Sequence, residues 1–332
     1  MTDEPKDPAL ARWDTYWQHG FLTSCADAFQ GNYAGSIAAH WHDAFSALAD
    51  DAQILDVCTG NGAVAALAAR AAIDRGVAHR VTGIDLAAIR PAEALADDPE
   101  VLARIDFRSR TSADATGLAD HSVDLAVGQY ALEYTPLATT LPELARVVRP
   151  GGGLNFILHD LQSVVLATTR EELSHRDRLA GPDGIFGAAL ALGRIVGEAR
   201  TAGQTAALAQ DPRAETSRRW LNTEAARLTE AARQSPHPEI LLTVLDYAKR
   251  IYEAMAGGNT DGGRALAERA RREIAANFAR LDDLVDAASS VADKAELAAR
   301  LGETGFDVEE PSALRHDNLL IGWSFTATRR ES

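Results

Sequence analysis

The sequence predicts an α/β protein with a doubly wound, mostly parallel seven-stranded sheet and an all-helical insertion between strands five and six. Two observations lead to this fold class. From residue 53 to 160, short β-branched apolar runs alternate with Ala-rich amphipathic stretches, which is the pattern of βαβ units. From residue 161 to about 292 the pattern is helical throughout, and strand-like runs return only towards the C-terminus.

The individual elements follow from hydrophobic periodicity and turn residues. Strands are expected near 53–57, 80–84, 105–109, 123–128 and 153–158, and helices near 62–75, 89–97 and 138–148. Two more strands are expected after a helix and a turn at Gly305, the last of them in LLIGWSFTATRR. In the insertion, the clearest helical stripe comprises Leu241, Val244, Leu245, Ala248, Ile251, Tyr252 and Met255, which Gly257 and Gly258 should end.

Composition and charge exclude several classes of protein. The 332 residues are 46% hydrophobic, which is enough for a sizeable core and excludes a disordered chain. A formal net charge of -15 disfavours nucleic-acid binding, because phosphate contacts need clustered Lys and Arg. Cys25 and Cys58 lack the spacing of a disulfide framework or zinc site, which indicates a reducing compartment. The N-terminus is acidic and no long apolar run occurs, so we expect a cytoplasmic protein without membrane attachment.

The strongest local motif is ILDVCTGNGAVAALAA at residues 54–69. An apolar strand ends near Asp56, and a glycine-containing turn then opens an Ala-rich helix, which is a geometry that lets the backbone approach a ligand closely. Gly60, Gly62 and Ala65 also satisfy the GxGxxA form of a dinucleotide loop. This stretch alone therefore does not decide between a nicotinamide cofactor and S-adenosylmethionine.

Four further features together resemble the class I (Rossmann-like) S-adenosylmethionine-dependent methyltransferase family. They are Asp56 at the end of the first strand, Asp85 in VTGIDLA, Asp114 in SADATGLAD, and the pair SVDLAVGQYALEY and LARVVRPGGG. The resemblance implies that S-adenosylmethionine is the cofactor, with Asp85 on the ribose hydroxyls and Asp114 on the adenine amine. The cofactor-binding residues it implies are Asp56, Cys58, Thr59, Gly60, Asn61, Gly62, Asp85, Leu86, Asp114, Ala115 and Gln129. Cys58 departs from the family pattern, which commonly has glycine at that position.

The same resemblance directs the residues after strands four and five towards the methyl acceptor. These positions are Gln129, Tyr130, Glu133 and Tyr134, followed by His159 and Asp160. His159, Glu133 and Tyr130 are the expected catalytic residues, with His159 as the first choice of general base and a hydrogen-bonded strand-end histidine as the alternative. The expected substrate contacts are Trp17, Asn32, Tyr33 and Tyr134.

These patterns divide the chain into four expected parts. Residues 1–50, which hold three of the five tryptophans, are expected to form an aromatic helical lid segment. Residues 51–160 form the Rossmann-like cofactor-binding core, and residues 161–292 form a helical insertion that acts as a cap or a dimerisation surface. Residues 293–332 complete the core sheet.

Two charged patterns have a simpler explanation than a binding site. His40 and His42 form an HxH pair without a third metal ligand in the sequence, so no metal is expected. Arginines of the insertion, such as Arg218 and Arg219, alternate with Glu and are typical of a solvated helix face.

The sequence thus predicts an enzyme that methylates oxygen or nitrogen of a small-molecule acceptor. We expect no nucleic-acid or membrane partner, and a homodimer through the helical insertion. Two alternatives stay open at this point: an NAD(P)-dependent oxidoreductase, because the glycine loop also suits a dinucleotide, and a non-catalytic scaffold that binds S-adenosylmethionine.

Overall fold

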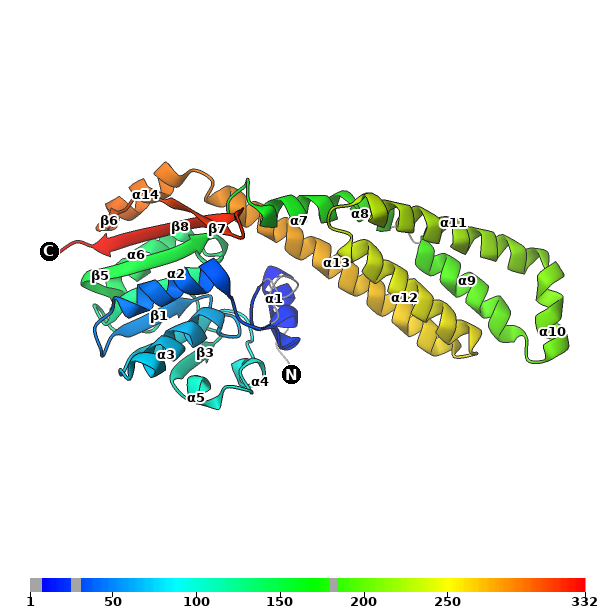
Figure 1. The fold of residues 1–332 in the computed structure, drawn as a ribbon, viewed down its shortest axis with the longest axis horizontal. Coiled ribbons are helices and arrows are strands. Elements are labelled where there is room, and N and C mark those ends of the chain that lie inside the picture. Colours follow the sequence, from blue (N-terminus) through cyan, green and yellow to red (C-terminus); the bar gives the residue numbers. More distant parts are fainter. Residues whose placement is uncertain (1–7, 25–30, 180–183, 332) are drawn as a thin grey trace. The chain divides into compact units, whose positions relative to one another are not determined.

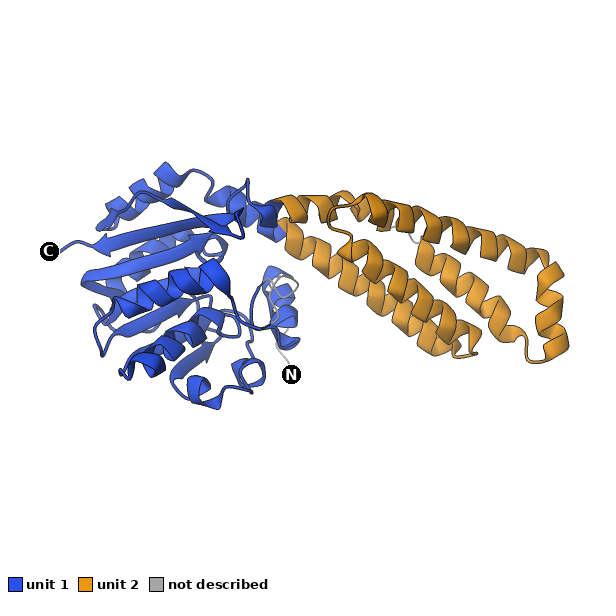
Figure 2. Cartoon of the chain, viewed as in Figure 1, with its two compact units in different colours: residues 1–166, 283–332 blue, residues 167–282 orange. Residues whose placement is uncertain are grey.

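The protein divides into two compact units, which are described separately (Figure 2). The computed structural model describes residues 8–24, 31–179 and 184–331, so Cys25 lies outside the described residues. Unit 1 comprises residues 1–166 and 283–332, and unit 2 comprises residues 167–282. Each unit has a hydrophobic core of its own.

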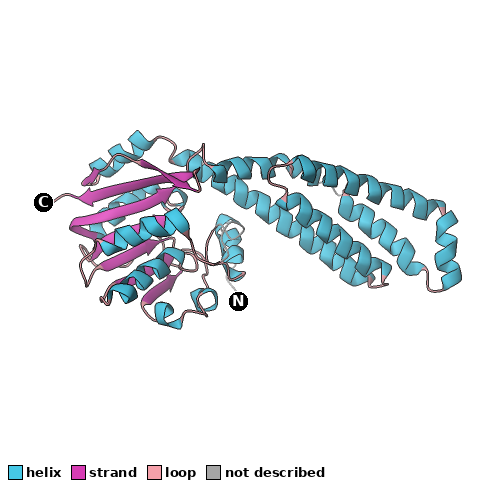
Figure 3. Ribbon diagram, in the orientation of Figure 1, coloured by secondary structure: helices cyan, strands magenta, loops and turns pink. Residues whose placement is uncertain are grey.

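Unit 1 is built on a single eight-stranded sheet with the order β3-β2-β1-β4-β5-β8-β6, and β7 also pairs with β8 (Figures 1 and 3). β1 to β5 pair in parallel, whereas β8 is antiparallel to its neighbours. The mostly parallel α/β sheet predicted from the sequence is confirmed. The strands are β1 (Gln53–Val57), β2 (Arg80–Asp85), β3 (Ile105–Ser109), β4 (Val123–Gln129), β5 (Val148–Leu158), β6 (Phe306–Val308), β7 (Ser312–His316) and β8 (Leu319–Arg329).

The sheet has eight strands where the sequence predicted seven, because the expected sixth strand is interrupted. β6 and β7 lie one after the other along the same edge of β8. Between them the pairing register changes by one residue, from Val308↔Ala327 to Ser312↔Ser324. Pro311 falls at this step and has no N–H to donate to the ladder, so it ends the pairing locally.

Helices cover both faces of the sheet, as expected for a doubly wound fold. One core packs α2 and α3 against the sheet around Trp41 and Phe45, and the other packs α6 and α14 around Leu144 and Leu301. Consecutive residues of β1 alternate between the cores, with Ile54 in the first and Leu55 in the second. The helices of unit 1 are α1 (Pro8–Gln18), α2 (Gly35–Ser46), α3 (Ala63–Arg75), α4 (Pro91–Ala94), α5 (Pro99–Leu102), the 3₁₀ turn η1 (Leu132–Tyr134), α6 (Leu137–Val147) and α14 (Lys294–Glu303).

The single helix predicted over 89–97 is instead two short helices, α4 and α5. Each begins with a proline, Pro91 or Pro99, whose fixed φ suits a first turn and whose missing N–H prevents continuation from the turn before. The Asp98 side chain accepts the Val101 N–H and so caps α5.

The described residues between 161 and 292 form helices only. These are α7 (Val164–Ser174), α8 (Arg176–Leu179), α9 (Ile185–Glu198), α10 (Ala202–Ala207), the 3₁₀ turn η2 (Leu208–Gln210), α11 (Pro212–Gln234), α12 (Glu239–Ala256) and α13 (Thr260–Ser290). Leu241, Val244 and Ile251 of the predicted stripe lie in the core of unit 2, and α12 ends directly before Gly257. Within the described part of the chain, no helix is long and apolar enough to cross a membrane.

Two helices continue across the division between the units. α7 begins in unit 1 at Val164, and the last turns of α13, from Asp283 to Ser290, also belong to unit 1. Unit 2 therefore starts and ends a few residues inside the helical stretch of 161–292. This matters for the site, because the end of α13 lines its cavity.

Candidate active site

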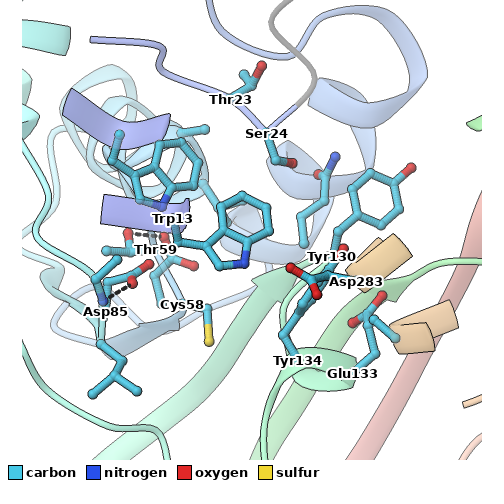
Figure 4. A pocket seen from close by; sticks show the side chains of 18 of the residues that line it. Trp13, Thr23, Ser24, Cys58, Thr59, Asp85, Tyr130, Glu133, Tyr134 and Asp283 are labelled. Atoms are coloured by element: carbon cyan, nitrogen blue, oxygen red, sulfur yellow. Dashed lines mark hydrogen bonds between the residues drawn. The ribbon is translucent and has the colours of Figure 1, made fainter. Parts of the chain in front are cut away.

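A cavity of about 460 Å³ lies at the carboxyl ends of the parallel strands of unit 1 (Figure 4). Asp56, Asp85 and Gln129 line it from β1, β2 and β4. β1 and β4 are neighbours, and the strand order runs outwards from them in opposite directions. The cavity therefore lies at the topological switch point, where open α/β sheets bind their ligands.

α1 and the end of α13 provide the opposite wall of this cavity. Trp13 of α1 stacks on Trp17 at 5.9 Å between ring centroids and meets Tyr134 edge-on at 5.5 Å. Arg12 holds α1 to α13, because its guanidinium donates to both carboxylate oxygens of Asp283 at 2.6–2.8 Å. Aromatic rings and an ion pair thus fix the N-terminal helix over the strand ends.

Asp56 anchors the loop that follows β1. Its Oδ2 accepts the Thr59 hydroxyl at 2.5 Å and the Ala65 N–H at 3.0 Å, which ties the loop to the first turn of α3. Burial raises the pKa of Asp56 to about 7, partly offset by these hydrogen bonds. Gly60 has φ +54, and a Cβ there would come within 2.5 Å of the Trp17 ring, so the loop requires glycine at this residue.

Asp85 ends β2 and holds the same loop from the other side. Its Oδ2 accepts the Gly60 N–H at 2.8 Å, and its Oδ1 accepts the Ala87 N–H at 2.7 Å. Burial raises the pKa of this carboxyl to about 6. The side chain lines the cavity, as does Leu86, which is exposed on its rim. The carboxylate is thus rigidly placed, with acceptor capacity left for a ligand.

Cys58 occupies a backbone conformation that favours glycine. Its φ is +52, in the left-handed region where a non-glycine residue is strained. Glycine has no Cβ and adopts this conformation without strain, which suits the glycine that is common at this position in the family that the sequence resembles. The thiol lies on the cavity wall, and burial together with the carboxylates of Asp85 and Asp56 raises its pKa well above the usual range.

Three residues of the predicted loop, Gly60, Asn61 and Gly62, do not line the cavity. The Asn61 side-chain amide donates to the carbonyl oxygens of Trp17 and Phe21, and its oxygen accepts the Arg90 N–H. Asn61 therefore ties the loop to the N-terminal segment instead of facing a ligand. Gly62 has φ +97 and packs against Phe107, whose ring lies 2.5 Å from where a Cβ would be.

Asp114 and Ala115 also lie outside the cavity lining. The Asp114 carboxylate accepts the hydroxyls of Ser112 and Thr139, the latter at 2.9 Å, and these bonds lower its pKa. Ala115 is exposed. The predicted adenine-contacting residues are therefore not part of the cavity lining that Asp56 and Asp85 share.

Gln129, at the end of β4, has an amide whose orientation is fixed by a buried tryptophan. Trp41 Nε1 donates to Gln129 Oε1 at 2.8 Å, and since an indole N–H only donates, the amide oxygen must face it. Gln129 Nε2 is then left buried without a hydrogen-bond partner on a side chain that lines the cavity. Trp41 is thus both a core residue and a positioning residue.

Tyr130 and Tyr134 flank a tight turn directly after β4. Tyr130 has φ +52, and its hydroxyl donates to the Ile321 carbonyl at 2.9 Å. Its ring lines the cavity and stacks on the His159 ring at 4.1 Å. Tyr134 lines the cavity beside Trp13. The phenol of Tyr130 is therefore engaged with backbone, and its ring forms part of the wall.

Glu133 lies on the η1 turn between these two tyrosines and is 5% exposed. Its Oε1 accepts the His159 backbone N–H at 2.9 Å, whereas Oε2 has no hydrogen-bond partner. Burial raises the pKa of Glu133 to about 7. This residue lines the cavity, and Figure 4 shows it with Tyr134 and Asp283 on one side, across from Asp85.

His159 lies in a different hollow, beside Asp160, Lys294 and Trp323. Its ring is 3% exposed, and burial lowers its pKa to about 3, so the imidazole is neutral at pH 7. Asp160 accepts a hydrogen bond from Lys294 Nζ at 3.0 Å. The predicted first-choice base is therefore not placed in the cavity, since the Tyr130 ring stacks against it.

The N-terminal residues predicted for the acceptor are divided by the structure. Trp17 and Tyr33 line the cavity. Asn32 does not: its amide donates to the Ala63 carbonyl, and its oxygen accepts the Tyr33 N–H. His40 contacts Asn155 through its ring, and among the described residues no three His, Cys, Asp or Glu side chains gather as a metal site.

Sequence reasoning missed the cavity residues of α13, which are Asp283, Asp286, Ala287 and Ser290. No local signal marks them, because they are the last turns of a long amphipathic helix far along the chain from Asp56. Trp13 belongs to the aromatic N-terminal segment, but no local pattern marks it as a cavity residue. An Arg–Asp pair such as Arg12 and Asp283 leaves no signature in a single sequence.

Part of the chain is similar to known proteins. Residues 54–152 match a family model described as a methyltransferase domain. No curated protein matches the chain. Among solved structures, the chain is 15% identical to geranyl diphosphate C-methyltransferase from Streptomyces coelicolor A3(2), with 48% of this chain and 68% of that chain covered and a TM-score of 0.35. The chain is 26% identical to an S-adenosylmethionine-dependent methyltransferase from Mesorhizobium loti, with 38% of this chain and 56% of that chain covered and a TM-score of 0.31.

The matched residues include β1, the glycine loop, β2 and β4, which are the elements that build the cavity. Fold and site thus define an enzyme class, the S-adenosylmethionine-dependent methyltransferases. The matched residues 54–152 form its methyltransferase domain, and S-adenosylmethionine is its cofactor.

Proposed function

We propose that this enzyme transfers a methyl group to oxygen or nitrogen of a small molecule bound in the cavity of unit 1. The observation that carries the proposal is the cavity itself: one wall is the loop from Asp56 to Thr59, and the other is formed by Glu133, Tyr134 and α1. Donor and acceptor would share one covered space, where alignment and exclusion of water supply most of the rate enhancement.

Asp85 and Gln129 are the proposed anchors of the cofactor. The Asp85 carboxylate is fixed by two backbone N–H groups and is suited to accept the ribose hydroxyls. The unpartnered Nε2 of Gln129 is a buried donor that a ligand oxygen would satisfy. When bound, S-adenosylmethionine supplies an electrophilic methyl group on a sulfonium. Trp13 and Trp17, which line the cavity, would exclude water from it.

The size and charge of the cavity support a small acceptor without phosphate. Its volume of about 460 Å³ is typical of a small-molecule site. Its lining, within the described residues, contains no Lys, Arg or His to receive a phosphate. The geranyl diphosphate named for the Streptomyces structure is therefore not proposed as the acceptor here. With its acidic charge and few cysteines, the enzyme is proposed to act in the cytoplasm.

Calorimetric titration tests the proposed cofactor site. We expect S-adenosylmethionine and S-adenosylhomocysteine to bind and NAD not to bind, and Asp85→Ala to weaken both sulfur ligands strongly. Asp97→Asn is the matched control, because Asp97 is exposed and lies outside the cavity lining. Binding of NAD without either sulfur ligand would support the oxidoreductase alternative and contradict the proposal.

A further inference from the structure

A buried carboxylate in the cavity wall has an oxygen without a hydrogen-bond partner. Glu133 is 5% exposed, and its Oε2 has no hydrogen-bond partner, although Oε1 accepts the His159 N–H. Leaving a buried carboxylate oxygen unpaired is costly, so native proteins keep such groups where a ligand completes them. The partner of a carboxylate must donate a hydrogen bond, and a cation satisfies it best.

The charges around the cavity point to the same kind of ligand. Five carboxylates line it, and its described lining has no basic side chain. Asp56 and Asp85 are bound to the loop backbone, and Asp283 is neutralised by Arg12. Of these five, Glu133 is the buried carboxylate that keeps an oxygen without a hydrogen-bond partner. A negative, partly enclosed cavity concentrates cations and repels anions.

Aromatic rings line the same part of the cavity. Trp13 and Tyr134 meet edge-on beside Glu133, and Tyr33 contributes a further ring to the lining. Aromatic faces attract ammonium ions through their quadrupole, and walls of aromatic rings with a carboxylate are a recurrent way to bind them. An alcohol donates a hydrogen bond to a carboxylate but brings no positive charge to it or to the rings, and a carboxylate ion is repelled.

We infer that the methyl acceptor is an amine which enters as its ammonium ion, and that Glu133 binds this ion and accepts its proton. The inference rests on the proposed function and names its substrate class. In the proton step an N–H bond breaks, the proton forms an O–H bond with Glu133 Oε2, and the nitrogen keeps the electron pair. That pair is what a nitrogen needs in order to act as a nucleophile, because an ammonium has none.

A competing assignment concerns the cofactor, which carries an amino group of its own. If Glu133 bound that amino group, changing it would weaken binding of S-adenosylhomocysteine. If Glu133 binds the acceptor, affinity for S-adenosylhomocysteine stays unchanged and only the second ligand is affected. The two assignments are therefore separated by a binding measurement that does not depend on turnover.

The experiment is calorimetric titration of the full protein saturated with S-adenosylhomocysteine. The probes are n-butylammonium, benzylammonium and 2-(indol-3-yl)ethylammonium, each compared with the carboxylate and the alcohol of the same carbon skeleton. We expect at least one ammonium ion to bind about tenfold or more tightly than its matched alcohol, in line with a charge-assisted hydrogen bond, and the carboxylates not to bind. In Glu133→Gln this preference should fall by about tenfold, with unchanged affinity for S-adenosylhomocysteine.

Glu303→Gln is the matched control, because Glu303 is exposed on α14 and lies outside the cavity lining. It should retain the full preference for ammonium. Thermal unfolding of both variants checks that they are folded. Failure of all three ammonium ions to bind, equal binding of a carboxylate, or an unchanged preference in Glu133→Gln overturns the inference. Failure of S-adenosylhomocysteine to bind the unmodified protein would instead remove the proposed function.

Discussion

The two units of this protein place their polar groups in opposite ways. Unit 1 buries the carboxylates of Asp56, Asp85 and Glu133 and holds Cys58 and Tyr130 at positive φ. In the described part of unit 2, Thr169 and His175 are the only buried polar side chains, and no residue other than Gly258 has positive φ. Among the described residues, the buried carboxylates thus occur in unit 1, where a ligand is expected.

Unit 2 places its charges in pairs on helix surfaces. Arg218 and Arg219 both approach Glu215, and Arg227 pairs with Glu224 one turn away. The prediction that these arginines form a solvated helix face is confirmed, since their side chains are exposed. Exposed ion pairs at i,i+3 and i,i+4 add little to the free energy of unfolding. The interior beneath them is apolar, with Leu241 and Ile251 fully buried.

The largest expected effect is in the helical core. Leu241→Ala removes a fully buried side chain, and we expect it to lower the free energy of unfolding of unit 2 by about 3 kcal/mol. Urea unfolding followed by circular dichroism measures it. Leu242→Ala, on the same helix but 52% exposed, should change stability by less than about 0.5 kcal/mol. Equal effects of the two changes would show that unit 2 lacks this packed core.

The next largest effect is in the cofactor site and should spare the fold. Asp85→Asn keeps the size of the side chain but loses the charge, so we expect affinity for S-adenosylhomocysteine to fall by about 2 kcal/mol, roughly 30-fold. Leu241→Ala should leave this affinity unchanged. A large loss of affinity in Leu241→Ala, measured by calorimetry, would show that the two units are not functionally separate.

The pH dependence of stability is a third way to test the comparison. The pKa of Glu133 is about 7 in the folded protein against an ordinary 4.5, so the folded state binds more protons between these values. Stability from this group is present below about pH 4.5 and is lost as the pH rises through 7. Glu133→Gln should therefore match the unmodified protein near pH 4.5 and be more stable at pH 8, by roughly 1 to 2 kcal/mol.

Urea unfolding at the two pH values measures this difference, with Glu303→Gln as the control. His159 acts in the opposite direction: its pKa of about 3 means that the stability it supplies is lost as the pH falls from about 6.5 towards 3. If Glu133→Gln changed stability equally at both pH values, the carboxyl group would not be the buried, ionisable group that the structure describes.

The smallest expected effect concerns the strained loop. At Cys58, φ is +52, which costs any residue with a Cβ more than glycine. Cys58→Gly should therefore be about 1 kcal/mol more stable than Cys58→Ala, which has no thiol either but keeps the Cβ. Thermal unfolding of the two variants compares them directly. Equal stability would show that the loop relaxes when the thiol is removed.

Local sequence patterns predicted the strands and the loop well, because a buried parallel strand and a glycine turn each have a signature within a few residues. Asp56, Asp85 and Gln129, which the family resemblance implied as cofactor contacts, all line the cavity. The prediction was wrong for His159, because the residue that packs against it is not adjacent in the sequence. His159 follows β5 as predicted, but the Tyr130 ring lies against it, and only the packing of β4 on β5 shows this.

The sequence alone determined the α/β class, the nucleotide loop and the helical character of residues 161–292, since each follows from local periodicity or from a contiguous motif. The cofactor followed from the resemblance of several separate motifs to a known family. Tertiary structure decided which acidic and aromatic residues share the cavity. The end of α13 reaches the strand ends through Arg12 and Asp283, 271 residues apart, and Trp41 orients Gln129 from another element. Such contacts depend on packing in three dimensions, which residue order along the chain does not encode locally.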